Sequence, residues 1–152
     1  MLKGIDHRLN ADVLYALRAM GHGDMLILAD TNFPAASIAA ETVHGELLRM
    51  ENIGVGEAAE AILSVLPLDT FVEDFAGRME VVGEPDTVPP PQREVQAAIA
   101  ATGEKRAMVP IERFAFYDLA REAYAVIQTG ERRFYGCIML RKGVIGPPES
   151  QA

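Results

Sequence analysis

The sequence predicts one layered α/β domain in which helices cover a mostly parallel or mixed sheet. Short apolar runs alternate with amphipathic helical patterns along the chain, which is typical of helices packed against a sheet. The chain has 152 residues, and 49% of them are hydrophobic, so a single domain can be stabilised by an ordinary core. No repeat period is visible that would indicate a different architecture.

The N-terminal part of the chain contains one predicted helix and one predicted strand. The helix spans Ala11–Met20, because its apolar residues form a single stripe, and Asn10 and Gly21 can cap its two ends. The run Met25–Ala29 is continuously apolar, which predicts a strand buried on both faces. Polar residues that follow such a strand lie where layered α/β domains commonly bind ligands.

Two helices are predicted in the middle of the chain. Gly56–Leu66 is rich in helix-forming residues, and Pro67 stops it. Pro85–Pro91 is the least structured stretch, and it leads into a helix over Gln92–Ala101 that Gly103 ends.

The C-terminal part is predicted to supply one more helix and three strands. In order, these are strand Met108–Ile111, helix Phe114–Glu122, strand Tyr124–Gln128 and strand Cys137–Leu140. We therefore expect one ordered domain over residues 1–145, followed by a flexible tail over residues 146–152 that begins Gly-Pro-Pro.

Composition excludes several classes of partner. Lys and Arg total 14 against 22 Asp and Glu, and the resulting net charge of -8 argues against nucleic-acid binding. No apolar stretch approaches the roughly 20 residues that a membrane helix needs, and the first ten residues do not resemble a secretory signal. The single cysteine, Cys137, cannot form an internal disulfide. We expect a cytoplasmic protein with neither a membrane nor a nucleic-acid partner.

Two short segments combine residues suited to proton transfer and to sugar binding. His22 lies between Gly21 and Gly23 at a helix exit, where it can carry protons near neutral pH or simply cap the helix carbonyls. Asp30 opens the segment Asp30-Thr-Asn-Phe-Pro34, whose carboxylate, amide and aromatic ring suit a sugar. An Asx-turn before the proline explains the same residues without a ligand.

Two later segments are also candidates. In Arg113-Phe-Ala-Phe-Tyr117, the guanidinium can bind a ligand hydroxyl or can pair with Glu112 or Asp118 on the surface. In Thr129–Cys137, Tyr135 stands at the start of a predicted strand, although a solvated hairpin accounts for this segment equally well.

Other chemistries lack support in the sequence. The three histidines are far apart and show no zinc-ligand spacing, and both the phosphate-binding glycine motifs and the G-x-S-x-G elbow are missing. Cys137 has the pattern of a strand residue rather than of an activated nucleophile. Proton transfer without a cofactor or metal remains.

Five segments, in this order and spacing, resemble the fucose mutarotase and ribose pyranase family. They are Met20-Gly-His-Gly-Asp24, Leu28-Ala-Asp-Thr-Asn-Phe-Pro34, Leu66-Pro-Leu-Asp-Thr70, Glu112-Arg-Phe-Ala-Phe-Tyr117, and Thr129-Gly-Glu131 followed by Tyr135-Gly136. The resemblance extends to Lys142-Gly-Val144, and the Arg-Phe-Ala-Phe-Tyr stretch is more similar to the fucose branch.

This resemblance implies a three-layer α/β/α fold that interconverts sugar anomers without cofactor or metal, in a homo-oligomer whose pockets lie near subunit contacts. His22 falls on the family's proton donor. The sugar-contacting positions fall on Asp30, Asp69, Arg113, Tyr117, Tyr135 and Gly136, and on position 137. There the family usually has Asn and this chain has Cys137, a weaker hydrogen-bonding group, which leaves the preferred sugar open.

The resemblance leaves three functions to separate. The first is a mutarotase for L-fucose or a sugar of similar stereochemistry. The second is a ribose pyranase, which interconverts pyranose and furanose rings. The third is a sugar-binding homologue without catalysis. Mutarotation itself needs only one group that gives and takes protons near pH 7, which is a role that suits His22.

Overall fold

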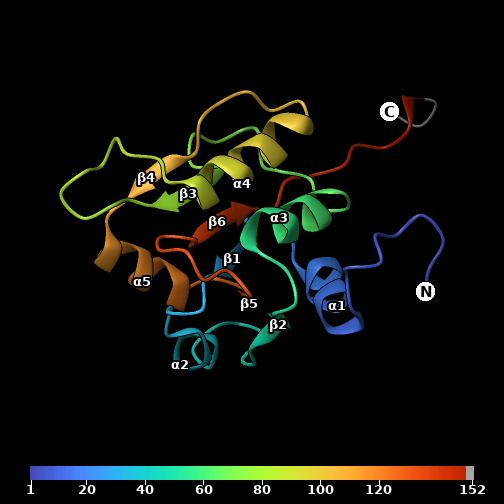
Figure 1. The fold of residues 1–152 in the computed structure, drawn as a ribbon. Coiled ribbons are helices and arrows are strands. Elements are labelled where there is room, and N and C mark those ends of the chain that lie inside the picture. The colour runs from blue at the N-terminus through green and yellow to red at the C-terminus, as the bar shows by residue number, and fades with distance from the viewer. Residues whose placement is uncertain (150–152) are drawn as a thin grey trace.

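A six-stranded mixed sheet forms the centre of the computed structural model, which describes residues 1–149 (Figure 1). The strands are β1 (Met25–Ala29), β2 (Leu48–Met50), β3 (Ala76–Met79), β4 (Val109–Ile111), β5 (Ala125–Thr129) and β6 (Ile138–Arg141). The helices of this part of the chain are α1 (Ala11–Ala19), α2 (Ala35–Ala39), α3 (Val55–Leu63), α4 (Pro90–Ala101) and α5 (Arg113–Arg121).

The strand order is β2-β5-β1-β6-β3-β4. Strand β5 pairs in parallel with β1 and β2, and β3 pairs in parallel with β4. Strand β6 runs antiparallel to both of its neighbours, β1 and β3. The expectation of a mixed sheet is therefore confirmed, and β1 lies inside it, which explains its unbroken apolar sequence.

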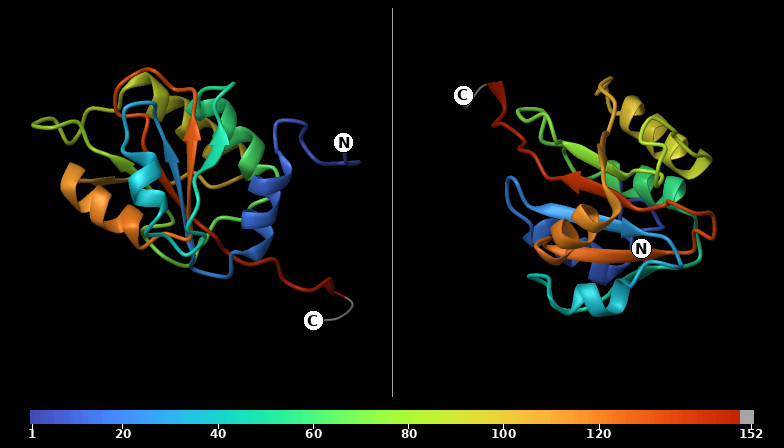
Figure 2. Two further views of the ribbon diagram at one scale, coloured as in Figure 1. Left: turned by 90° about the horizontal axis from the view of Figure 1, so that it is seen from below. Right: turned by 90° about the vertical axis from the view of Figure 1, so that its left-hand side faces the viewer.

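Helices cover both faces of the sheet, and the left view of Figure 2 shows α5 and α1 on opposite sides of it. On one face, Leu26 and Leu28 of β1 belong to a core formed with α1, α3 and α4. On the other face, Ile27 and Ala29 belong to a core formed with α2 and α5. Successive residues of β1 thus enter opposite cores, as strand geometry requires, and the three-layer α/β/α prediction is confirmed.

Most predicted elements are present, with ends that shift by a few residues. Asn10 caps α1 as expected, because its side-chain oxygen accepts a hydrogen bond of 3.0 Å from the amide of Val13. Helix α3 ends at Leu63, before the predicted Leu66. Helix α4 begins at Pro90 rather than Gln92, because proline fits the first turn, where the helix needs no amide donors.

Three elements and one connection differ from the sequence-based expectation. Helix α2 and strand β2 are very short, and β3 has the sequence Ala-Gly-Arg-Met, so local propensity favours none of them. A hairpin through residues 129–137 is wrong, because β1 lies between β5 and β6 in the sheet.

Two further expectations concern membrane helices and the C-terminal tail. Among residues 1–149, every helix is too short or too polar to cross a membrane. The flexible tail over residues 146–152 stays a prediction, and its last three residues lie outside the described part of the chain.

Close backbone packing at Gly143 gives a stability prediction. A Cβ atom at Gly143 would lie 2.3 Å from the carbonyl oxygen of Leu68, so Gly143→Ala must displace backbone. We expect the free energy of unfolding in urea to fall by about 1–3 kcal/mol. Gly146→Ala is the matched control, because a Cβ atom there meets nothing within 4 Å. Equal stability of the two variants would contradict this account.

Candidate functional site

The predicted site residues form two groups at opposite ends of β1. His22 and Asp69 lie beside its first residue, whereas Asp30 follows its last and faces Arg113 across a cavity. The five residues of β1, at roughly 3.3 Å each, separate the two groups by about 16 Å along the sheet. A single chain therefore does not bring all the predicted residues together.

The first group pairs an exposed imidazole with a buried carboxylate. Nε2 of His22 lies 3.1 Å from Oδ2 of Asp69; the side chain of His22 is 50% exposed and that of Asp69 is 4% exposed. An ionised carboxylate only accepts hydrogen bonds, so Nε2 donates and the neutral ring leaves its lone pair on Nδ1. The ring of Phe71 meets the imidazole edge-on, with centroids 6.2 Å apart. Together these contacts orient His22.

Capping α1 is the role of another residue. Nζ of Lys142 donates to the carbonyl oxygens of Leu17 and Met20 at 2.7 and 2.5 Å, so two carbonyls at the end of α1 already have a donor. Partial burial lowers the pKa of Lys142 below its usual range, because desolvation disfavours the charged amine. The imidazole of His22 is consequently not committed to the helix carbonyls.

The second group surrounds a cavity of about 380 Å³ at the other end of β1, which we call the Asp30 cavity. Its volume lies within the range of small-ligand sites. Its lining residues combine polar and apolar side chains from four separate parts of the chain: Asp30, Asn32, Phe33, Met79, Arg113, Tyr117, Phe134, Tyr135 and Cys137. Five of the predicted sugar-binding residues thus meet in one place.

Asp30 forms the expected Asx-turn and also lines the Asp30 cavity. Its Oδ1 accepts hydrogen bonds of 3.0 Å from the amides of Asn32 and Phe33, which is the Asx-turn. Its Oδ2 accepts from the amide of Gly136 at 3.1 Å. A carboxylate offers about four acceptor positions, and these three amides occupy three of them. A Cβ atom at Gly136 would lie 2.6 Å from Cγ of Glu131, so glycine allows the backbone to approach Asp30 this closely.

Arg113 points to the cavity rather than to neighbouring acids. Its Nε donates to the phenol oxygen of Tyr117 at 3.1 Å, and this hydrogen bond raises the pKa of Arg113 above its usual range. Glu112 instead accepts from two backbone amides at the start of α5, and Asp118 pairs with Arg121. The expected alternative of a surface pair with Glu112 or Asp118 is therefore wrong.

The sequence pattern predicts some of the other cavity residues and not the rest. Asn32 and Phe33 belong to the segment Asp30–Pro34, whose amide and aromatic ring the sequence already identifies as suited to a sugar. Met79 comes from β3, a strand that the local pattern does not predict, and Phe134 comes from the loop before β6. Only the pairing of β3 with β6 brings Met79 to the cavity.

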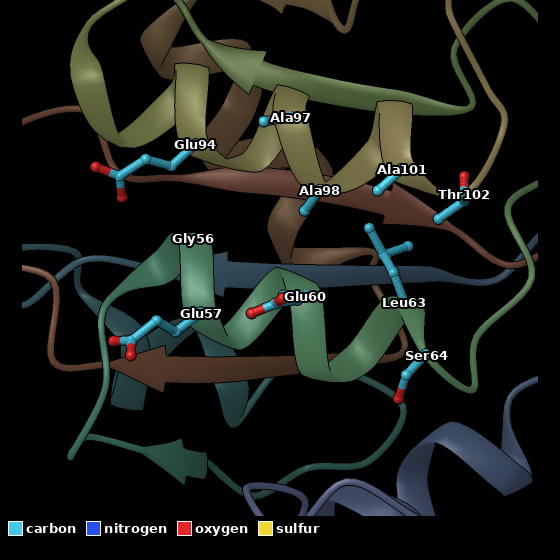
Figure 3. A pocket seen from close by; sticks show the side chains of 10 residues that line it. All are labelled: Gly56, Glu57, Glu60, Leu63, Ser64, Glu94, Ala97, Ala98, Ala101 and Thr102. Carbon is cyan, nitrogen blue, oxygen red and sulfur yellow. The ribbon is translucent and has the colours of Figure 1, made fainter.

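A larger hollow of about 770 Å³ lies on the outer surface between α3 and α4 (Figure 3). Leu63, several small side chains and three glutamates, Glu57, Glu60 and Glu94, line it. Gly56 lets the helices approach closely, since a Cβ atom there would lie 2.7 Å from Cβ of Glu94. This groove is a consequence of helix packing and contains no residue of either group.

These features define a class of protein: a three-layer α/β domain with a cavity of small-ligand size at one end of its central strand β1 and a histidine–carboxylate pair at the other. The RbsD / FucU transport protein family matches residues 3–145, and the chain belongs to this family.

Among residues 1–149, His, Cys, Asp and Glu side chains form no group that could hold a metal ion.

Three similar proteins illustrate this membership. The human fucose mutarotase is 44% identical over 148 residues, which cover 95% of this chain and 94% of that protein. The crystal structure of protein Atu2016 is 58% identical with a TM-score of 0.93, covering 96% and 97% of the two chains. A fucose mutarotase from Streptococcus pneumoniae in complex with L-fucose is 34% identical with a TM-score of 0.85, covering 95% and 100%.

The environment of Cys137 predicts an unreactive thiol. Cys137 is buried, and burial together with the charge of Asp30 raises its pKa well above the usual range, so the thiolate is scarce near neutral pH. We expect alkylation by iodoacetamide at pH 8 to be at least about tenfold slower in the native protein than in the urea-unfolded chain. Because Cys137 is the single cysteine, total thiol loss measures this directly. Equal rates in the two states would contradict the assignment.

Proposed function

We propose that this protein is a mutarotase that interconverts the anomers of L-fucose, or of a sugar of similar stereochemistry, by acid/base catalysis without a cofactor. The observation that carries the proposal is the pairing of a solvent-facing imidazole, His22, with a buried carboxylate, Asp69, at 3.1 Å. The fucose mutarotase relatives and the Asp30 cavity support the sugar as substrate.

The chemistry requires a group that both gives and takes a proton. Mutarotation removes the proton of the anomeric hydroxyl and protonates the ring oxygen, and the open aldehyde then recloses on its other face. With Nε2–H held by Asp69, Nδ1 of His22 is the atom that exchanges protons with the sugar. The carboxylate stabilises the imidazolium when the ring carries the additional proton, so Asp69 acts as a positioning residue in this scheme.

The cavity supplies the contacts that hold the sugar. Asp30 and the guanidinium of Arg113 offer an acceptor and donors for sugar hydroxyls, and the phenols of Tyr117 and Tyr135 add further hydrogen-bonding positions. The amide of Gly136 is bound to Asp30 and helps to fix that carboxylate.

We further propose that the functional unit is a homo-oligomer in which His22 of the partner subunit faces the Asp30 cavity. The separation of the two groups by about 16 Å along β1 supports a site shared between subunits. Large exposed rings flank both groups: Phe71, 75% exposed, lies beside His22, and Phe134, 73% exposed, lines the cavity. Such rings favour burial against another subunit.

The apolar side of the cavity favours L-fucose over ribose. Phe33, Met79 and Cys137 are all buried and line the cavity, which gives it a surface that suits a methyl group. L-fucose carries such a methyl group and ribose does not. A sugar-binding protein without catalysis would not need the orientation of His22 by Asp69. The single buried cysteine fits a reducing compartment, so we place this activity in the cytoplasm.

The catalytic role of His22 is tested by His22→Gln. We expect a folded protein in which anomer exchange of L-fucose, measured by magnetisation-transfer NMR, is at least about tenfold slower, as for loss of a general acid/base. His7→Gln is the control, because the His7 side chain is 76% exposed and lies in neither group. An unchanged exchange rate for His22→Gln would exclude the proposed role.

The shared site is tested by mixing two variants. His22→Gln and Arg113→Met should each be nearly inactive alone. The two variants are then unfolded together in equal amounts and refolded. Each shared site takes residue 22 from one subunit and residue 113 from the other, so about a quarter of the sites would contain both His22 and Arg113, and activity should return. Light scattering should report a mass several times 16.5 kDa. A clean monomer, or a mixture no more active than its parts, would contradict the proposed assembly.

A further inference from the structure

Tyr135 has a backbone conformation that its own residue type disfavours. Among residues 1–149 it is the one non-glycine residue with a positive φ, +63°, in the left-handed region. Its phenol oxygen accepts a hydrogen bond of 3.3 Å from the amide of Val82, and its side chain lines the Asp30 cavity. A tyrosine persists in this conformation only where its surroundings hold it there.

The amide of Gln92 supplies that constraint. Gln92 is fully buried in the first turn of α4. Its Nε2 donates to two backbone carbonyl oxygens, that of Tyr135 at 2.9 Å and that of Met79 at 2.6 Å. Both acceptor residues line the Asp30 cavity, whereas Gln92 does not. The side chain of Gln92 thus links the loop before β6 to strand β3 without itself lining the cavity.

Arg78 fixes which way this amide points. Arg78 is buried, and in the described part of the chain its hydrogen bonds go to neutral oxygens: the carbonyls of Thr87 and Pro85, and Oε1 of Gln92 at 3.5 Å. Because a guanidinium only donates, it orients the oxygen of Gln92 towards itself. The amide nitrogen must then face Tyr135 and Met79. The same arginine holds the proline-rich loop that follows Val82.

We propose that Gln92 is a positioning residue for sugar binding, which acts by holding Tyr135 in the left-handed conformation at the cavity. The inference rests on the proposed function of the Asp30 cavity as the sugar site. Without the amide donor, the carbonyl of Tyr135 loses its partner and the residue relaxes towards negative φ. Its ring then leaves the position in which it meets the sugar, and Gly136 moves with it.

The expected effect falls on binding rather than on proton transfer, because the His22–Asp69 pair lies at the other end of β1 and is not altered. The test variant is Gln92→Glu, which preserves the size of the side chain and offers Arg78 a carboxylate, but cannot donate to the two carbonyls when ionised. We expect KM for L-fucose in anomer exchange to rise about tenfold or more, with the rate at saturating sugar within about threefold of the native protein.

Gln96 provides a matched control on the same helix. Its amide also bridges backbone groups, donating to the carbonyl of Arg106 at 3.0 Å and accepting from the amide of Met108 at 2.9 Å, away from the cavity. Gln96→Glu should leave KM unchanged. Should Gln92→Glu fail to fold, Gln92→Met replaces it, since methionine matches the volume of glutamine without a charge.

A second measurement needs no sugar and separates this inference from the proposed function. Backbone chemical shifts and the HN–Hα coupling of Tyr135 report its φ, and we expect them to change in the Gln92 variant but not in Gln96→Glu. An unchanged φ at Tyr135 in the folded Gln92 variant would overturn the inference whatever the substrate. If the native protein accelerates L-fucose exchange, an unchanged KM in the Gln92 variant would also overturn the inference. If the native protein does not accelerate exchange, the proposed function fails instead, and the φ measurement still decides the role of Gln92.

Discussion

The rigidity of β1 at the centre of the sheet is the constraint on which both halves of the candidate site depend. Its apolar side chains are buried in the two cores, and its backbone pairs with β5 on one side and β6 on the other. A strand held in this way cannot bend to bring its ends together. The two groups at its ends are therefore kept apart by the length of β1, about 16 Å along the sheet.

Strand β6 connects these two ends, because it runs antiparallel to β1. Before β6 begins, the amide of Gly136 reaches Asp30, and Cys137 lines the same cavity. After β6 ends, Lys142 closes the last turn of α1, and Gly143 packs against the backbone that carries Asp69. One strand thus supports the Asp30 cavity with its first end and the surroundings of the His22–Asp69 pair with its last end.

Buried polar side chains do much of this positioning. Asp30, Asp69, Arg78 and Gln92 are all buried, and each forms hydrogen bonds that fix a neighbouring loop or ring. Burial of such groups is costly unless they are paired, but once paired they specify one arrangement. Asp30 and Gln92 in particular bond to backbone groups of residues that line the Asp30 cavity. An uncharged sugar needs such directional contacts, because the net negative charge of the chain does nothing to attract it.

The sequence by itself determined the layered α/β class, the boundaries of β1, the cap at Asn10 and the residue types gathered around Asp30 and Arg113. These depend on patterns and hydrogen bonds that span a few residues. Only the tertiary structure decided that His22 meets Asp69 rather than the end of α1, that β1 separates β5 from β6, and that Ala-Gly-Arg-Met forms a strand. It also decided that Gln92 supports Tyr135. Each of these outcomes pairs residues far apart in the chain, and such pairs are selected by the burial of the whole sheet, which overrides local propensity.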